Sequence, residues 1–183
     1  MPISLGCIAD DFTGATDLAN MLVKGGLKTI QLLGTPSKND VVPSVDAVII
    51  ALKTRTIPVE DAIEQSLQAM NWLKNAGAKQ FFFKYCSTFD STDEGNIGPV
   101  IDALMAGLET QFTIACPAFP ETERTIFKGH LFVGDKLLSE SPMKDHPLTP
   151  MPDSNLVSTL SRQTSQKVGL VEYKKISGGP SEI

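Results

Sequence analysis

Few features of this chain point to a membrane, a nucleic acid or a disulfide-stabilised fold. Its 183 residues include only three cysteines, two histidines and one tryptophan. The net charge is −5 and no Lys/Arg cluster offers a footprint for a phosphate backbone, so nucleic-acid binding is not expected. No apolar run approaches membrane-spanning length, and the first residues lead straight into an apolar run without a signal-peptide pattern. We therefore expect a cytoplasmic protein without nucleic-acid or membrane partners.

The sequence also lacks the motifs of several common sites. Cys7, Cys86 and Cys116 have no zinc-ligand spacing, and each lies in or beside an apolar run, so we predict buried free thiols. His130 and His146 have no visible partner for a triad or a metal site. Neither a Gly-x-x-x-x-Gly-Lys-Ser/Thr loop nor a Gly-x-Gly-x-x-Gly fingerprint is present, so no nucleotide site is recognisable.

What the sequence does contain is a regular alternation of strand and helix patterns. The predicted strands cover 3–9, 29–33, 47–52, 80–85 and 112–116, and the predicted helices cover 15–24, 59–74 and 98–108. Such alternation is typical of a mostly parallel sheet with right-handed crossovers. We predict a Rossmann-like, three-layer α/β domain.

The pattern changes after Pro120. Short strands are predicted at 125–127 and 130–133, followed by a proline-rich stretch. Asp153 could then cap a helix over 156–160, and a further strand is predicted at 168–171. We expect a short β/loop appendage in this part of the chain.

Asp10 and Asp11 stand between the first predicted strand and the first predicted helix. Open α/β sheets bind ligands at this edge, outside the carboxyl ends of their strands. Asp11 or Thr13 could cap the helix, but capping explains one such residue and not two adjacent carboxylates. A general base for a hydroxyl, or a ligand for the hydroxyls of a polyol, explains the pair.

Two further polar clusters follow the third and fourth predicted strands. Arg55 has a planar fork that suits a carboxylate or phosphate, the alternative being a solvated surface arginine. Arg124 could add a cation, unless Glu121 and Glu123 neutralise it. The other candidate donors and acceptors for a small polyhydroxylated ligand are Lys84, Ser87, Asp90, Ser91, Thr92 and Asn96. We predict that these residues line one pocket together with the aspartate pair.

Six stretches form a distinctive set of motifs: 8–17 (Ile-Ala-Asp-Asp-Phe-Thr-Gly-Ala-Thr-Asp), 52–55, 83–92, 95–100, 117–120 and 146–151. They resemble the four-carbon acid sugar kinase family, and in particular its 3-oxo-tetronate kinase branch. The resemblance implies phosphorylation of the terminal hydroxyl of a four-carbon sugar acid by ATP with Mg²⁺. It also implies two halves, a substrate-binding half that this chain resembles throughout and a C-terminal nucleotide-binding domain that would bind the ATP. In one departure, close relatives carry Gly-Arg where this chain has Glu123-Arg124.

On that basis Asp11 or Asp10 would be the base, and Arg55 or Lys84 would hold the carboxylate of the substrate. No residue is assigned to the nucleotide or to a metal ion, and a homodimer is a candidate assembly. Two other interpretations stay open. The chain could be a non-catalytic module that binds sugar acids, or a structural α/β domain without a ligand.

Overall fold

The computed structural model describes residues 3–37, 40, 43–90 and 92–182, which form two compact units. The first unit holds the described residues of Met1–Cys86 together with Pro99–Thr113. The second unit holds those of Ser87–Gly98 and Ile114–Ile183. The α/β fold with a parallel sheet is confirmed, and the predicted appendage after residue 120 lies within the second unit.

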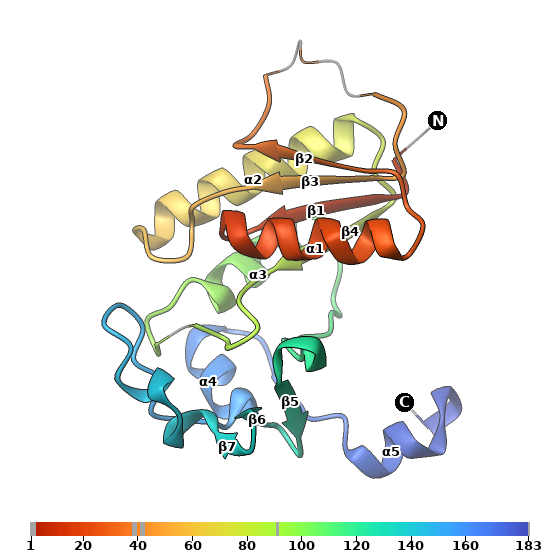
Figure 1. The fold of residues 1–183 in the computed structure, drawn as a ribbon. Coiled ribbons are helices and arrows are strands. Elements are labelled where there is room, and N and C mark those ends of the chain that lie inside the picture. Colours follow the sequence, from red (N-terminus) through yellow and green to blue (C-terminus); the bar gives the residue numbers. More distant parts are fainter. Residues whose placement is uncertain (1–2, 38–39, 41–42, 91, 183) are drawn as a thin grey trace. The chain divides into compact units, whose positions relative to one another are not determined.

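A parallel four-stranded sheet in the order β2-β3-β1-β4 forms the centre of the first unit (Figure 1). Its elements are β1 (Leu5–Ala9), α1 (Phe12–Lys24), β2 (Thr29–Leu33), β3 (Ala47–Ala51), α2 (Val59–Asn75), β4 (Gln80–Lys84) and most of α3 (Ile97–Gly107). Each of these seven was predicted at nearly these bounds. Helix α1 begins three residues before the predicted start because Asp11 is its N-cap.

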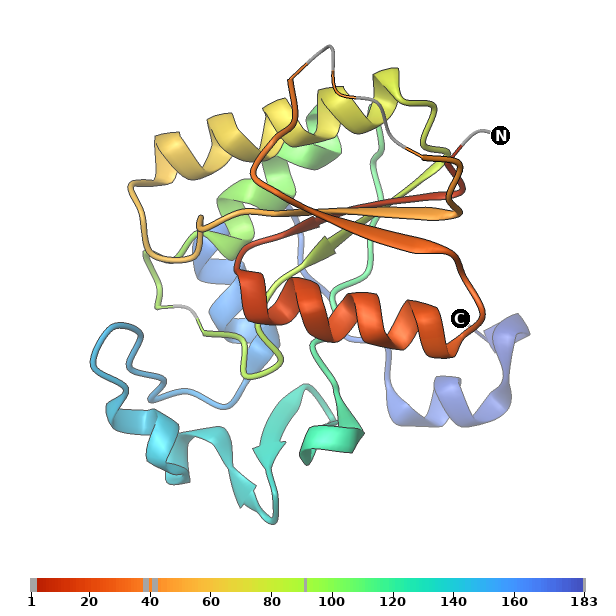
Figure 2. The ribbon, with the colours of Figure 1, turned by 45° about the horizontal axis from the view of Figure 1, so that its top comes forward.

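Helices cover both faces of this sheet, α1 on one side and α2 with α3 on the other (Figures 1 and 2). Alternate strand residues point to opposite faces. Ile8 and Ile50 therefore pack toward α2 and α3, while Cys7 and Ile49 pack toward α1. All five residues of β3 are buried, which explains why its sequence is apolar throughout.

The second unit contains a small antiparallel sheet in the order β5-β6-β7 and several short helices (Figure 1). Its elements are η1 (Pro120–Thr122), β5 (Arg124–Phe127), β6 (His130–Val133), β7 (Lys136–Leu137), η2 (Leu138–Glu140), η3 (Pro142–Asp145), α4 (Leu156–Gln163), α5 (Tyr173–Gly178) and η4 (Pro180–Glu182). Helix α4 is capped by Asn155, whose Oδ1 accepts the Ser158 N–H at 3.1 Å. The prediction of Asp153 as the cap is wrong, because Asp153 lies two residues before the N-cap and its carboxylate accepts the N–H of Asn155 itself at 2.8 Å.

Two predicted strands are absent. Segment 112–116 is not a strand, and Phe112 and Ile114 are 76% and 75% exposed. Alternating apolar residues favour an extended chain, but a strand also needs a hydrogen-bonded neighbour, and no described strand pairs with this segment. Segment 168–171 is likewise irregular and leads into α5.

The three cysteines differ in exposure, although all three were predicted to be buried. Cys7 is buried, and burial raises the pKa of its thiol to about 12. Cys86 is half-buried, and Cys116 is exposed because its segment is not part of a sheet. The prediction of buried thiols is therefore wrong for Cys116.

Glu123 adopts the backbone conformation that a glycine would favour. Its φ of 59° and ψ of 28° are left-handed, and its N–H closes η1 on the Pro120 carbonyl at 2.9 Å. A left-handed conformation costs about 1–2 kcal/mol for a residue with a side chain. The turn before Arg124 is therefore formed without a glycine, at a cost in stability.

Candidate functional site

The carboxyl ends of three strands bring the first polar cluster together in the first unit. Ala9 of β1 lies in register with Ala51 of β3 and Lys84 of β4. Backbone hydrogen bonds continue past the strands, from Asp10 N–H to the Lys84 carbonyl and from Thr54 N–H to the Asp10 carbonyl, each at 3.0 Å. The residues that follow β1 and β3 are thereby fixed against each other.

Asp10 and Arg55 form a buried, bidentate ion pair at this edge of the sheet. The Arg55 Nε donates to Asp10 Oδ2 at 2.9 Å, and its Nη2 donates to Asp10 Oδ1 at 2.8 Å. The Asp10 side chain is 4% exposed, so burial raises the pKa of its carboxyl, and the hydrogen bonds and charge of Arg55 oppose that rise. Burial acts to lower the pKa of Arg55, but the contacts with Asp10 outweigh it and raise that pKa.

Asp11 is the more accessible carboxylate of the pair. Its side chain is 28% exposed, and its Oδ1 accepts the Gly14 N–H at 2.7 Å as the cap of α1. The same oxygen lies 3.0 Å from Arg55 Nη2. Arg55 therefore holds both aspartates, one of them buried and one facing outward.

Lys84 supplies a second cation beside the helix start. Its Nζ donates to the Tyr85 carbonyl at 2.7 Å and lies 3.3 Å from the place that a Cβ on Gly14 would occupy. That Cβ would also stand 2.7 Å from Asp11 Oδ1. A residue without a side chain at position 14 therefore leaves room for the carboxylate and the ammonium.

The remaining predicted site residues belong to the second unit. Thr88 donates a hydrogen bond to Asp90, and both side chains are buried, as is Asn96. Ser87 and Thr92 are half-buried. Ser91 lies outside the described residues. Arg124 donates from Nη1 to the Thr122 carbonyl, and its buried Nε has no partner among the described residues.

The structure thus brings together Asp10, Asp11, Arg55 and Lys84 within the first unit. The predicted pocket also included residues of the second unit, and that part stays a prediction.

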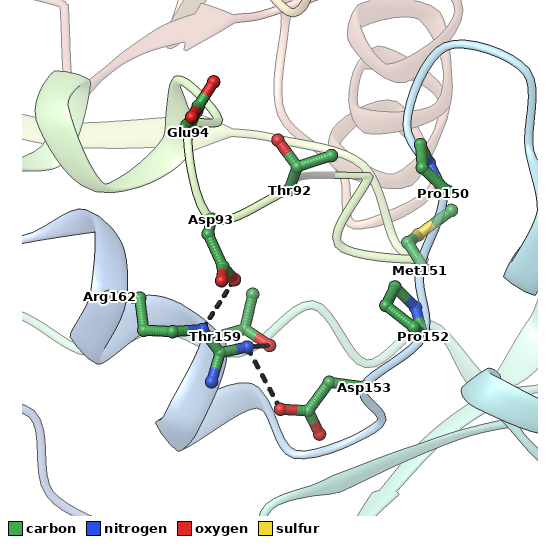
Figure 3. A pocket seen from close by; sticks show the side chains of 9 residues that line it. All are labelled: Thr92, Asp93, Glu94, Pro150, Met151, Pro152, Asp153, Thr159 and Arg162. Atoms are coloured by element: carbon green, nitrogen blue, oxygen red, sulfur yellow. Dashed lines mark hydrogen bonds and ion pairs between the residues drawn. The ribbon is translucent and has the colours of Figure 1, made fainter.

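A pocket that the sequence did not predict lies within the second unit (Figure 3). It has a volume of about 400 Å³. It is lined by Thr92, Asp93, Glu94, Pro150, Met151, Pro152, Asp153, Thr159 and Arg162. Among these lining residues, only Thr92 was predicted from the sequence as a ligand-binding residue.

Arg162 lies in the wall of this pocket and forms ion pairs with two carboxylates, those of Asp93 and Asp153 (Figure 3). Its Nε donates to Asp93 Oδ1 at 2.5 Å, its Nη2 to Asp153 Oδ2 at 3.1 Å and its Nη1 to Ser158 Oγ at 2.5 Å. Burial acts to raise the pKa of Asp153, but hydrogen bonds from the Asn155 N–H and from Arg162 lower it overall. Sequence patterns indicate this cluster only weakly, because an arginine at the end of a helix is usually a solvated surface residue.

Two absences apply to the described part of the chain. No three His, Cys, Asp or Glu side chains there are grouped so that they could hold a metal ion. No helix there is long and apolar enough to cross a membrane.

Comparison with known proteins decides the family. The family model described as "Sugar-binding N-terminal domain" matches residues 5–183. This chain belongs to that family. It is 63% identical over 179 residues to a curated protein of Burkholderia multivorans named 3-oxo-tetronate kinase, covering 98% of this chain and 42% of the relative. The chain thus spans less than half the length of the curated relatives it matches.

Solved structures support the same fold for this sugar-binding domain. A Haemophilus influenzae protein of 56% identity superposes with a TM-score of 0.94, covering 97% of this chain and 43% of that one. A Bordetella bronchiseptica protein of 28% identity has a TM-score of 0.75 over 88% of this chain and 41% of its own. That second structure is described as a domain-swapped dimer with bound citrate. The resemblance seen in the sequence is thereby confirmed.

Proposed function

We propose that this chain is the sugar-acid-binding part of a two-domain kinase that phosphorylates the terminal hydroxyl of a four-carbon acid, with 3-oxo-tetronate as the favoured substrate. The observation that carries the proposal is the arrangement of Asp11, Asp10 and Arg55 at the carboxyl edge of the sheet. The similarity to proteins named 3-oxo-tetronate kinase supplies the substrate class.

The contacts favour Asp11 over Asp10 as the base. Both oxygens of Asp10 accept hydrogen bonds from Arg55, and its side chain is almost fully buried. Asp11 faces outward, where the hydroxyl of a sugar acid can reach it. Its carboxylate would accept the hydroxyl proton as the hydroxyl oxygen bonds to the γ-phosphorus of ATP, the bond from that phosphorus to the bridging oxygen breaks and ADP leaves.

The same contacts change the role proposed for Arg55. A guanidinium that already holds two aspartates suits an orienting role better than the anchoring of a substrate carboxylate. Lys84 is then the better candidate for that anchor, because its ammonium has three N–H donors and gives one to the Tyr85 carbonyl.

ATP with Mg²⁺ would supply the phosphoryl group in such a kinase. The sequence has no phosphate-binding loop that fits the triphosphate of that nucleotide. We therefore propose that the C-terminal part of the kinase binds the nucleotide. Phosphoryl transfer depends mostly on positioning and charge stabilisation, and this chain would contribute the positioning of the acceptor.

A chimera tests the proposal. Residues 1–183 replace the matching part of the Burkholderia multivorans relative, and ATP-dependent phosphorylation of 3-oxo-tetronate is measured. Asp11→Asn is expected to lower kcat by about 10²–10⁴-fold, the usual contribution of a general base. Asp17→Asn is the matched control, because Asp17 is an exposed residue of the same helix. An unchanged kcat in the Asp11 variant would remove it as the base.

A second candidate function is a non-catalytic module that binds sugar acids without transferring phosphate. The sequence contains no recognisable nucleotide-binding motif, which favours this candidate for the chain by itself. Calorimetry with tetronates, with and without an ATP analogue, separates the candidates. Binding without turnover by the chimera supports the module, and absence of any binding contradicts both.

We also propose a homodimer as the assembly. Its support is the Bordetella bronchiseptica relative, whose structure is described as a domain-swapped dimer. Light scattering that gives the mass of a single 19.7 kDa chain at micromolar concentration would contradict it.

A further inference from the structure

The last two residues of α4 hold a segment that lies far away in the sequence. Gln163 Nε2 donates to the Thr92 carbonyl, and Gln163 Oε1 accepts the Gly98 N–H at 2.8 Å. One side-chain amide therefore joins both ends of the segment 92–98. We call this pair of contacts the Gln163 bridge.

Each end of the Gln163 bridge meets a backbone group at the start of a local structure. Gly98 is the second residue of α3, and N–H groups in the first turn of a helix have no acceptor within the helix. The Thr92 carbonyl also accepts the Gly95 N–H at 2.9 Å, which closes a turn. The bridge thus fixes the start of the helix and the start of the turn together.

The packing at Gly98 shows that this approach is close. A Cβ on Gly98 would stand 2.5 Å from the Cβ of Gln163 and 2.8 Å from its backbone carbon. Neither atom is the free end of a flexible side chain, so only a glycine fits. The neighbouring residue adds a second contact, since Arg162 Nε donates to Asp93 Oδ1 at 2.5 Å.

Two of the proposed substrate-binding residues, Thr92 and Asn96, lie within the segment that is held in this way. Resting on the function proposed above, we propose that Gln163 is a positioning residue, which sets Thr92 and Asn96 for the sugar acid through the backbone of the segment. It does not contact the ligand in this role.

Two variants of the 183-residue chain test the role. Gln163→Met keeps the length of the side chain and loses both hydrogen bonds. Gln163→Glu keeps an acceptor for the Gly98 N–H, which the helix start favours, and loses the donor to the Thr92 carbonyl. Gln68→Met is the control, because Gln68 is an exposed helix residue of the first unit.

Hydrogen exchange reports on the bridge without any ligand. We expect the Gly98 amide to exchange about tenfold faster in Gln163→Met, the usual effect of losing one hydrogen bond, and to stay protected in Gln163→Glu and in the control. Equal protection of that amide in all variants would overturn the bridge.

Calorimetry with 3-oxo-tetronate and other tetronates, well below the unfolding temperature of each variant, reports on positioning. We expect Kd to rise about five- to tenfold in both Gln163 variants and to stay unchanged in the control. A merely structural residue would lower Tm and leave Kd unchanged, and that result would overturn the positioning role alone. Absence of tetronate binding by the wild-type chain would contradict the proposed function and the positioning role with it.

Discussion

Removing Arg55 is expected to destabilise the first unit far more than removing Arg162 destabilises the second. Arg55→Met leaves the Asp10 carboxylate, 4% exposed, without the two hydrogen bonds of 2.8 and 2.9 Å that compensate its charge. Breaking a buried pair from one side costs about 3–5 kcal/mol. Because the Arg55 side chain is 19% exposed, we expect the lower end, about 3 kcal/mol.

The single tryptophan makes this measurable in the unit concerned. Trp72 of α2 packs against the core of the first unit, so its fluorescence follows the unfolding of that unit in urea. With a slope of about 2 kcal/mol per molar urea, a loss of about 3 kcal/mol lowers the midpoint by about 1.5 M.

Arg162→Met is the matched control. That arginine also holds two aspartates, but its side chain is 38% exposed, and exposed pairs contribute about 0–1 kcal/mol. The double variant Asp10→Asn with Arg55→Met should lose less than Arg55→Met alone, because it leaves no buried charge behind. The stability of the second unit in Arg162→Met is followed by the hydrogen exchange of its own amides, because Trp72 lies in the first unit. A midpoint shift below about 0.3 M for Arg55→Met, or an equal loss of stability of the second unit in Arg162→Met, would refute the reasoning.

One modification and three substitutions are expected to have effects that local geometry sets. Because burial raises the pKa of Cys7 to about 12, little of its thiolate forms at pH 8. Iodoacetamide should therefore label Cys116 in the folded chain and label Cys7 only after unfolding, which mass spectrometry can show. Glu123→Gly should stabilise the chain by about 0.5 kcal/mol in thermal unfolding, because the relief of the left-handed conformation exceeds the cost of the greater freedom of the unfolded chain. A lower Tm would contradict this. Gly98→Ala should cost about 1–3 kcal/mol through its clash, whereas Gly169→Ala has open space and should change stability little; equal effects would contradict the packing argument.

The sequence predicts the first unit well because its patterns are local. The apolar run 47–52 is typical of a parallel strand covered on both faces, and parallel strands place the residues after β1 and β3 at one edge. That places Asp10 near Arg55. Their hydrogen bonds to each other were not predicted, because a fork that suits a substrate carboxylate suits a protein carboxylate equally.

The second unit was harder to predict because its contacts join residues far apart in sequence. Arg162 reaches Asp93 across 69 residues, and no periodic pattern links them. The prediction of a strand over 112–116 was wrong for the opposite reason. Its local alternation is typical of a strand, but pairing depends on a neighbour that the pattern cannot supply.

The span of the Gln163 bridge has a consequence for the order of folding. Gln163 follows its partners by 65 and 71 residues, so the segment 92–98 cannot acquire its final geometry until α4 has formed. At about 5–20 residues per second, ribosomal synthesis delivers Gln163 about 3–13 s after Gly98. The four strands of the first unit are all complete by residue 84, and their sheet can form while the segment waits for its helix.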